Sequence, residues 1–501
     1  MLRIFSEQDY NNSRIPHCHS TEGLKEGFFH IKPLLRTFRS FKNAQKKVYY
    51  VVQTLNSMVK PFHCQIQEAG KHMKNASIFL KELLSGDLNG RMVEVYGCDS
   101  AKAQEYANRF AKVIKGFQVT FPGSAEKEIG LYSAPGRTEI GGNHTDHQYG
   151  CVLAASVNLD AIAAAALNGT DKIRFYSEGY GMIEADLSVL DPVESEKEST
   201  LALIRGMAAL AIKRGYEVKG IDVYCTSNVL GGSGLSSSAA FETLMGVILN
   251  DMFCGNVFDA VEIAKMGQIT ENQYFGKPSG LMDQSASSVG GVVAIDFGDP
   301  ENPQVEKINL DLAGEGYALC IIDSKSSHAD LTDAYASIPR EMKAVAATFG
   351  KTHLRGISKE DLIARTGAIR KVCGDRAFLR AIHFVLDNER AQQEAAALKA
   401  GDFDKFLEIV KASGRSSYMY LQNISVEGAV DNQAVGVALS LCDVLLEGRG
   451  AFRVHGGGFA GTVQAFVPLD MLDSFKATIE RAIAPGCCHV LSIRPVGGAV
   501  V

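Results

Sequence analysis

The sequence predicts an α+β protein with two packed domains and a small helical appendage in front of them. Its 501 residues, 46% of them hydrophobic, are enough for more than one core. From Glu128 onward, short apolar runs bounded by turn residues alternate with helical patterns, which indicates mixed strands and helices. A long, mostly helical stretch between about 340 and 412 follows a change of pattern near 300–318, where we expect the main boundary.

The first 72 residues differ in composition from the rest. They hold eleven Lys and Arg against five Asp and Glu, and five of the twelve histidines. No apolar core of a targeting peptide follows. The segment Glu68–His72, just before Met73, contains Glu, Gly and Lys, whose codons are rich in purines. A bacterial ribosome-binding site is also rich in purines and would give such residues if it were translated. We therefore expect 1–72 to be a non-native or disordered extension, with translation starting at Met73.

Three segments follow this extension: an appendage at 73–127, a first domain at 128–310 and a second domain at 311–501. The appendage is expected to contain helices at 73–85 and 101–118. The expected elements of the first domain are strands at 129–133, 151–157, 162–166, 173–176, 220–226 and 292–297, with helices at 201–214 and 237–253. Those of the second are strands at 318–323, 451–454, 462–467 and 490–495, the helical stretch, and helices near 430–447 and 470–484.

Net charge, apolar runs and cysteine content indicate which classes of partner and which compartment the protein has. A net charge of −6 argues against nucleic acid, which favours a basic surface. The most apolar run, Cys151–Leu167, is interrupted by polar residues and falls short of the roughly 20 apolar residues of a membrane helix. Eleven cysteines without a CxxC pair suit a reducing compartment. We expect a cytoplasmic enzyme, a monomer or weak homo-oligomer, that binds neither nucleic acid nor membranes.

The segment Leu230–Ala240, LGGSGLSSSAA, leads from a strand into a helix. Glycines allow close approach of backbone to an anion, and free N–H groups at a helix N-terminus attract one. An ordinary Ser cap after a tight turn is the competing interpretation. Neither a GxxxxGK[ST] P-loop nor a GxSxG nucleophile elbow occurs in the chain.

Two further glycine-rich segments flank this one. Ala134–Gly150 reads APGRTEIGGNHTDHQYG and packs Arg, Asn, His and Asp side chains between glycines, which suits a site for several hydroxyls. His144, Asp146 and His147 are also compatible with a metal site or a solvated loop. Arg453–Gly461, RVHGGGFAG, lies between two predicted strands and is also compatible with a tight hairpin.

Taken together, these segments resemble the three signature motifs of the GHMP kinases, and the first resembles the galactokinase form. The block Glu271–Gln284, ENQYFGKPSGLMDQ, is similar to the family segment with a metal-binding Glu and a catalytic Asp. The resemblance covers residues 128–501. It implies a ribosomal protein S5 domain 2-like N-terminal domain and a ferredoxin-like C-terminal domain.

The resemblance also implies a role for each matching residue. ATP is expected on Gly232, Ser233, Gly234, Leu235, Ser236, Ser237 and Ser238, with Ser177 as a further contact. Ser238 and Glu271 are expected to hold Mg²⁺. Asp283 is the expected base and Arg137 its charge-stabilising neighbour. The expected sugar contacts are Asn143, His144, Thr145, Asp146, the backbone of Gly280, and Tyr335.

The first motif departs from the usual galactokinase sequence GRVNLIGEHTDY. Glu139 stands for the Asn, Gly141 for the Ile, Asn143 for the Glu and His147 for the Tyr. Elsewhere, Leu230 replaces a Pro and Ala460 a Gly. Asn143 exchanges an anionic acceptor for a neutral amide at an expected sugar contact.

The expected activity is ATP-dependent phosphorylation of galactose at its anomeric hydroxyl. Because of Asn143, a uronic acid such as galacturonate, an N-acetylhexosamine or arabinose are alternative substrates. A non-catalytic sugar sensor on the same fold is a further alternative, and a metallohydrolase that uses His144–His147 is the last.

Overall fold

The structure is a computed structural model, which describes residues 72–124, 126–229, 234–277, 279–300, 302–326 and 331–501. The chain divides into the units Met1–Gln67 and Glu68–Val501, and the described residues belong to the second. Of the expected extension 1–72, all but His72 lie outside the described residues. So do Leu230, Gly232 and Ser233 of the glycine-rich loop.

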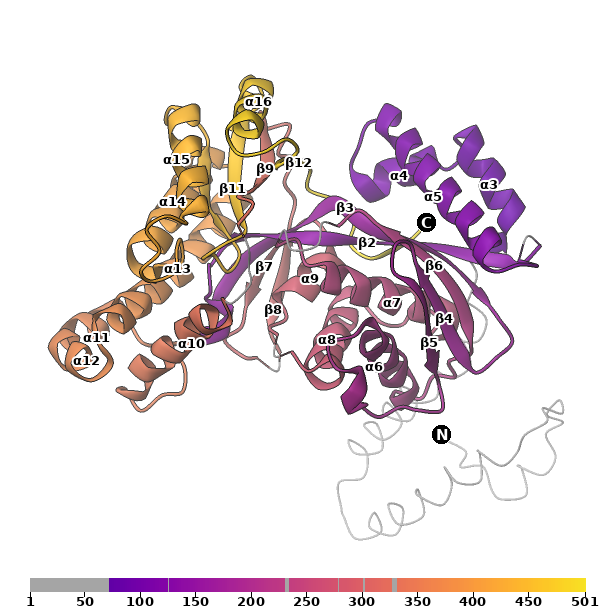
Figure 1. Cartoon of the computed structure of the whole chain (residues 1–501), viewed down its shortest axis with the longest axis horizontal. Coiled ribbons are helices and arrows are strands. Elements are labelled where there is room, and N and C mark those ends of the chain that lie inside the picture. The colour runs from indigo at the N-terminus through magenta and orange to yellow at the C-terminus, as the bar shows by residue number, and fades with distance from the viewer. Residues whose placement is uncertain (1–71, 125, 230–233, 278, 301, 327–330) are drawn as a thin grey trace, which may run out of the picture. The chain divides into compact units, whose positions relative to one another are not determined.

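A nine-stranded sheet forms the centre of this unit (Figure 1). Its main path is β1-β2-β3-β6-β4-β5, β13 also pairs with β2, and β7 joins β3 to β8. Neighbouring strands are antiparallel except β4 and β6. The strands are β1 (Lys74–Asn75), β2 (Glu128–Gly141), β3 (Cys151–Leu167), β4 (Lys172–Ser177), β5 (Gly181–Asp186), β6 (Ile221–Ser227), β7 (Val292–Asp296), β8 (Gln304–Ile308) and β13 (Ala499–Val500).

Helices cover both faces of the sheet around β3. Side chains alternate along a strand, so Ala163 packs in the core with α6 and α7, whereas Ala164 packs in the core of the appendage. Small residues on both faces allow the helices to approach from either side, as Figure 1 shows. The appendage contains α3 (Ala76–Ser85), α4 (Asn89–Tyr96) and α5 (Ser100–Thr120); the other face carries α6 (Thr200–Lys213), α7 (Ser237–Phe253), α8 (Ala260–Thr270) and α9 (Met282–Val289).

The buried carboxylate of Asp160 on β3 fastens the appendage to the sheet. It accepts hydrogen bonds from the Tyr96 hydroxyl of α4 (2.6 Å) and from the Arg109 guanidinium of α5 (2.8 Å). Arg494, from the other end of the chain, donates to the same carboxylate at 2.9 Å. A buried charge is tolerated where it is paired and hydrogen-bonded, and Asp160 meets both conditions.

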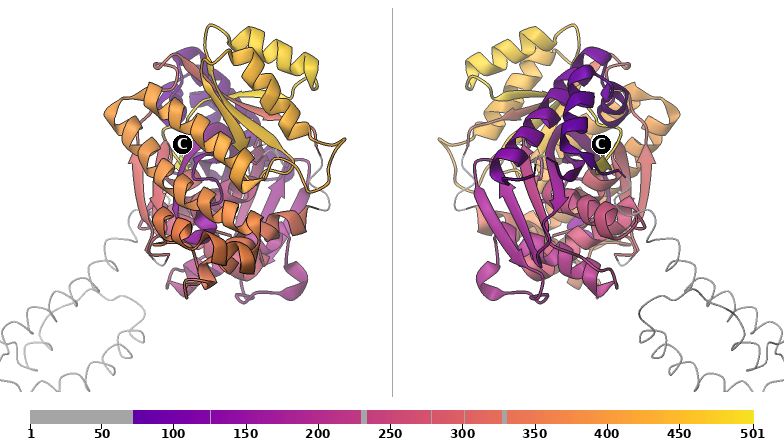
Figure 2. Two further views of the ribbon diagram at one scale, coloured as in Figure 1. Left: turned by 90° about the vertical axis from the view of Figure 1, so that its left-hand side faces the viewer. Right: turned by 90° about the vertical axis from the view of Figure 1, so that its right-hand side faces the viewer.

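A second, four-stranded antiparallel sheet has the order β10-β11-β9-β12. Helices α13 and α14 pack between one face and strands β2 and β3, whereas α15 and α16 cover the other face. Figure 2 shows the helices of this half of the unit in orange to yellow. The elements are β9 (Tyr317–Asp323), α10 (Thr332–Ala347), α11 (Lys359–Ala364), α12 (Thr366–Cys373), α13 (Asp375–Ala400), α14 (Phe403–Ser416), α15 (Ala434–Leu446), β10 (Ala451–His455), β11 (Thr462–Pro468), α16 (Leu472–Ala482) and β12 (Cys488–Leu491).

The predicted α+β class with its helical appendage is confirmed, and several elements differ in extent. The strand predicted at 129–133 continues to Gly141, so part of the first glycine-rich segment lies on β2. The strands predicted at 151–157 and 162–166 form the single strand β3, because the polar residues between them are hydrogen-bonded within the fold. Helix α3 begins at Ala76, after β1. The sheets change between Ile308 and Tyr317, and the predicted domain limits stay a prediction.

Judged by length and apolar character together, no helix in the described part of the chain qualifies as a membrane span.

Candidate functional site

An arginine–aspartate pair joins three of the four sequence segments. Arg137, on β2, donates through Nε to Asp283 Oδ1 (2.7 Å) and through its NH2 group to Asp283 Oδ2 (2.5 Å). The third guanidinium nitrogen donates to the Gly234 carbonyl of the glycine-rich loop before α7. Ser236 donates its hydroxyl to Asp283 Oδ2 at 2.7 Å. The expected base, its cation and the glycine-rich loop therefore meet at one point.

Asp283 stays ionised at this point. Burial alone would raise its pKa, but the Arg137 guanidinium and the Ser236 hydroxyl outweigh burial, so the pKa is lowered overall. The first turn of α9, where Asp283 lies, favours a negative charge as well.

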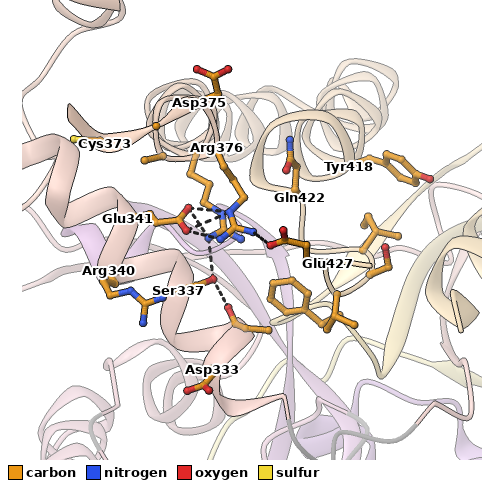
Figure 3. Close-up of a pocket in the computed structure, with 18 residues that line it drawn as sticks. Asp333, Ser337, Arg340, Glu341, Cys373, Asp375, Arg376, Tyr418, Gln422 and Glu427 are labelled. Atoms are coloured by element: carbon orange, nitrogen blue, oxygen red, sulfur yellow. Dashed lines mark hydrogen bonds and ion pairs between the residues drawn. The ribbon is translucent and has the colours of Figure 1, made fainter. Parts of the chain in front are cut away.

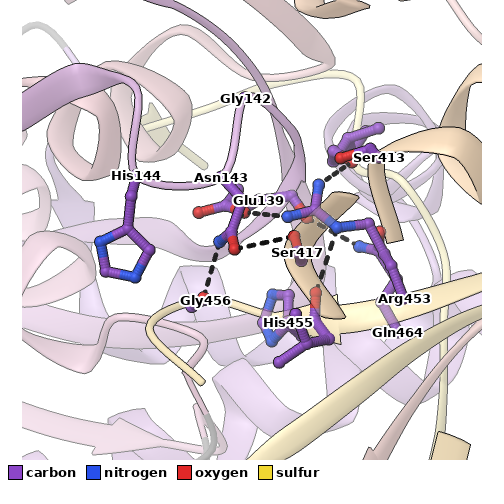
Figure 4. Close-up of polar contacts among 12 residues, drawn as sticks. Glu139, Gly142, Asn143, His144, Ser413, Ser417, Arg453, His455, Gly456 and Gln464 are labelled. Carbon is purple, nitrogen blue, oxygen red and sulfur yellow. Dashed lines mark hydrogen bonds and ion pairs between the residues drawn. The ribbon is translucent and has the colours of Figure 1, made fainter. Parts of the chain in front are cut away.

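Three consecutive carbonyls of the third segment accept hydrogen bonds from residues expected to line the sugar site. Gly456 accepts from the side-chain amide of Asn143 (2.8 Å), as Figure 4 shows. The Gly457 carbonyl lies 3.1 Å from His144 Nε2, and the Gly458 carbonyl accepts from the Tyr335 hydroxyl at 2.9 Å. A Cβ on Gly457 would lie 2.6 Å from the Tyr335 ring. The glycine run thus positions these side chains, and close packing requires Gly457.

His144 is neutral and has a defined tautomer. A carbonyl only accepts hydrogen bonds, so Nε2 carries the proton and Nδ1 is left as an acceptor. Burial, with His147 nearby, lowers the pKa of His144 to about 4. Asp146 lies beside Gly280, where a Cβ would be 3.1 Å from Asp146 Oδ2. The Asp146 carboxylate is near enough to act on Arg137, because with Asp283 it raises the pKa of that guanidinium against the effect of burial.

Asn143 is placed differently from the prediction. Its side chain is buried and donates to Glu139 (3.0 Å) and Gly456, while its oxygen accepts from Ser417 (3.2 Å) and Asn423 (3.0 Å). An amide has two N–H donors and two acceptor lone pairs, so all its capacity is used inside the protein. Asn143 therefore has no polar side-chain group to offer a sugar. Thr145 is likewise buried, and its hydroxyl contacts the Gly142 and Cys151 carbonyls.

The acidic residue that the usual motif has at position 143 is present in this chain at position 139, as Glu139. Glu139 Oε1 contacts the fully buried guanidinium of Arg453 at 2.5 Å and accepts the Asn143 amide (Figure 4). The usual Asn and Glu of the galactokinase motif have exchanged places, and in this chain the two side chains are hydrogen-bonded to each other. They form a buried amide–carboxylate pair.

The Ser238 hydroxyl, in the first turn of α7, faces the carboxylate of Glu271, which directly follows α8. The Ser238 hydroxyl lies 3.1 Å from Glu271 Oε1, and Gln284 Nε2 donates to Glu271 Oε2 at 2.9 Å. Hard oxygen ligands are what Mg²⁺ prefers, so the donor set fits that ion. Among the described residues of the ATP set, Gly234, Leu235, Ser236 and Ser237 lead into α7, and Ser177 ends β4 opposite Cys225 of β6.

Sequence reasoning missed several polar residues around this site. Lys277 forms an ion pair with Glu271, Gln284 bridges Glu271 to the buried Glu242, and His455 links Thr138 to Thr462. Glu242 follows Ser238 by one helical turn, a spacing that would have placed both on one face. The contacts of His455 and Lys277 depend on tertiary packing and leave no local pattern.

A cavity of about 930 Å³ lies next to this region without including any predicted site residue. Figure 3 shows its lining on α10 and α13 and in the loop after α14. Two of its three arginines, Arg376 and Arg380, pair with Glu341. The lining of the cavity is therefore rich in charges of both signs. Across the described ranges, no group of three or more His, Cys, Asp or Glu side chains is arranged to hold a metal ion.

Comparisons with known proteins agree with this geometry. Residues 202–291 match the family "GHMP kinases N terminal domain", and residues 115–167 match the "Galactokinase galactose-binding signature". A galactokinase from Lactococcus lactis is 31% identical over 365 residues, which cover 71% of this chain and 87% of the relative.

Solved structures give the same fold. The crystal structure of Lactococcus lactis galactokinase complexed with galactose superimposes with a TM-score of 0.66 at 26% identity, covering 79% of this chain and all of that one. A mevalonate kinase structure shares the fold at a TM-score of 0.51 and 14% identity, over 73% of this chain and 99% of the other.

Proposed function

The chain belongs to the galactokinase family of GHMP kinases, whose members are ATP-dependent sugar kinases, and we propose from this premise that it phosphorylates galactose. The acceptor is the anomeric hydroxyl, and the products are galactose 1-phosphate and ADP. The observation that carries the proposal is the two-point contact between Arg137 and Asp283 beside the nucleotide loop.

Asp283 is the proposed proton acceptor. As the anomeric oxygen attacks the γ-phosphorus, the bond from phosphorus to the β-phosphate oxygen breaks and the hydroxyl proton passes to Asp283. Among the described residues, Oδ2 accepts from Arg137 and Ser236, whereas Oδ1 accepts from Arg137 alone. Oδ1 therefore retains a lone pair for the sugar hydroxyl. A carboxylate this acidic is a weak base, which phosphoryl transfer tolerates because positioning and charge stabilisation dominate.

The N-terminus of α7 is the proposed phosphate site. Its free N–H groups and the preceding glycines would face the triphosphate of ATP. Ser238 and Glu271 would hold Mg²⁺, which neutralises phosphate charge when bound. Arg137 would stabilise the charge that develops during transfer.

The proposed sugar contacts are His144, Asp146, Tyr335 and the backbone of Gly280. Asp146 Oδ2 and the Nδ1 of neutral His144 are acceptors suited to sugar hydroxyls. Because the Asn143 amide is fully engaged within the protein, the Glu-to-Asn change gives no reason to favour an anionic sugar. Asn143 and Thr145 are proposed to shape the site from beneath.

The first experiment measures ATP turnover by the purified full chain with galactose, N-acetylgalactosamine, arabinose and galacturonate. We expect galactose to give the highest kcat/KM and Asp283→Asn to lower kcat by about 10²–10⁴-fold. Asp296→Asn is the matched control. Asp296 also forms an ion pair with an arginine, at 2.8 Å from Arg355, but it is not one of the predicted site residues. The kcat of this variant should remain close to that of the wild type.

Two results would contradict the proposal. A higher kcat/KM for another sugar would keep the kinase mechanism and replace the substrate. Binding of galactose without any ATP turnover would indicate a sugar sensor.

A further inference from the structure

We infer that Lys277 is a phosphate-binding residue, whose ammonium rests on Glu271 in the free protein and moves to the triphosphate when ATP binds. Lys277 Nζ lies 3.0 Å from Glu271 Oε1. The same oxygen lies 3.1 Å from the Ser238 hydroxyl, at the start of α7. The lysine charge is therefore next to the proposed phosphate site.

The two partners differ greatly in exposure. The Glu271 side chain is 3% exposed, whereas that of Lys277 is 57% exposed. A buried carboxylate needs a positive partner, and a mobile lysine supplies one from the solvent side. The ammonium thus occupies, in the free protein, the position beside Glu271 where a cation is required.

Only one oxygen of Glu271 depends on this lysine. Oε2 is fixed by Gln284, whose amide also donates to the buried Glu242 at 3.0 Å. The carboxylate would therefore keep its orientation when Lys277 leaves, and Oε1, which also accepts from the Ser238 hydroxyl, would face Mg²⁺ together with Ser238. The flexible stem of Lys277 allows its ammonium to follow a short path from Glu271 to an incoming phosphate oxygen.

The charge of Lys277 also reaches the reaction centre. Together with Arg137, it contributes to the lowering of the Asp283 pKa, against the effect of burial. A cation that contacts Glu271 and influences Asp283 would be attracted to the negative charge of the transferring phosphoryl group. Arg137 and Lys277 would then neutralise that charge from two sides.

This inference rests on the nucleotide site of the proposed function and is independent of which sugar is phosphorylated. The test measures dissociation constants of ATP and AMP by titration calorimetry on the full chain with excess EDTA, so that no metal contributes. Lys277→Met should weaken metal-free ATP binding about 10–100-fold, the range of a charge-assisted hydrogen bond. AMP binding should stay the same, because AMP lacks the phosphates that Lys277 would contact.

Two other variants complete the test. Lys277→Arg keeps the charge and should retain most of the ATP affinity. Lys197→Met is the matched control, because Lys197 packs against Gly276 but pairs with Glu194 at 2.8 Å; its ATP affinity should equal that of the wild type. Lys277→Gln serves as a second neutral variant if the Met variant aggregates.

Unchanged ATP affinity in Lys277→Met, or an equal loss of ATP and AMP binding, would overturn the inference. So would a wild-type chain that does not bind ATP without metal. If galactose is not phosphorylated although the ATP titrations behave as expected, the proposed substrate fails and the role of Lys277 stands.

Discussion

Glu139 and Asn143 hold the acid and the amide of the family motif in exchanged positions, and their side chains are hydrogen-bonded to each other. Glu139 contacts Arg453, and Asn143 donates to Glu139. Both side chains are buried, so neither can be altered without leaving a polar partner unsatisfied. We therefore expect the two residues to contribute to stability as a coupled pair.

A double-mutant cycle tests this coupling. Asn143→Glu alone places a second carboxylate against Glu139 and the Gly456 carbonyl, and should lower the free energy of unfolding by about 2–5 kcal/mol. Adding Glu139→Asn restores the usual family order and should recover at least about 1 kcal/mol relative to that single variant. Urea denaturation of the wild type, both single variants and the double variant measures these differences. Strict additivity would show that the two residues act independently.

Sequence reasoning identified the residue types of the site better than their contacts. Arg137, Asp283 and Ser236 contact one another, and each lies in a segment whose order and spacing resemble the family. The environment of Asn143 escaped prediction, since its partners Ser417 and Asn423 come from a distant segment without a signature. Hydrogen bonds across about 280 residues follow from tertiary packing and cannot be read from local pattern.

At the scale of elements, α5 crosses the sheet at a residue without a side chain. A Cβ on Gly116 would overlap with the ring of Tyr224 on β6, which is buried and stacked with Tyr176. Gly90 on α4, by contrast, has open space around the position of its Cβ. The appendage therefore contains one glycine required by packing and one that is not.

These two glycines predict opposite effects of the same substitution. Gly116→Ala should lower the free energy of unfolding by about 1–3 kcal/mol, because the added methyl overpacks the contact with Tyr224. Gly90→Ala should raise it by about 0.5–1 kcal/mol, because alanine is the better helix former. Chemical denaturation of both variants measures the difference. Equal effects would mean that α5 can shift away from β6 without cost.

Element prediction was most accurate where one pattern dominated. The helix predicted at 237–253 has those bounds, because its apolar content is continuous and a serine run precedes it. β3 was divided into two because Ser156, Asn158 and Asp160 interrupt its apolar run. Within the fold these residues bond to distant backbone or charged groups, such as Ser156 to the Arg494 carbonyl, which a single segment does not reveal.

At the scale of the whole unit, a buried carboxyl lies where α13 meets the first sheet. Glu394 is fully buried against Gly141 of β2, and neither of its oxygens has a hydrogen-bond partner among the described residues. Burial, together with Asp387 nearby, raises the pKa of Glu394 well above its usual range. Gly141, where the family usually has Ile, leaves room for this carboxyl.

The raised pKa makes stability depend on pH in a definite direction. Above about pH 4.3 the unfolded chain has lost this proton while the native protein keeps it, so stability falls as pH rises towards the native pKa. The slope approaches about 1.4 kcal/mol per pH unit for one proton. Glu394→Gln removes this dependence. The melting temperature of the variant minus that of the wild type should therefore increase from pH 5 to pH 8. Parallel curves for the two proteins would show that Glu394 does not retain its proton on folding.

The pairing of Asp160 with Arg494 has a consequence for synthesis on the ribosome. These partners are separated by 334 residues, and β13, which follows Arg494, completes the pairing of β2. At roughly 5–20 residues per second, the ribosome needs on the order of 20–70 s to make the intervening chain. During that interval the nascent first sheet has an unpaired edge and a buried aspartate with only part of its counter-charge. Chaperone binding to the growing chain should therefore persist until the segment with Arg494 and β13 has emerged.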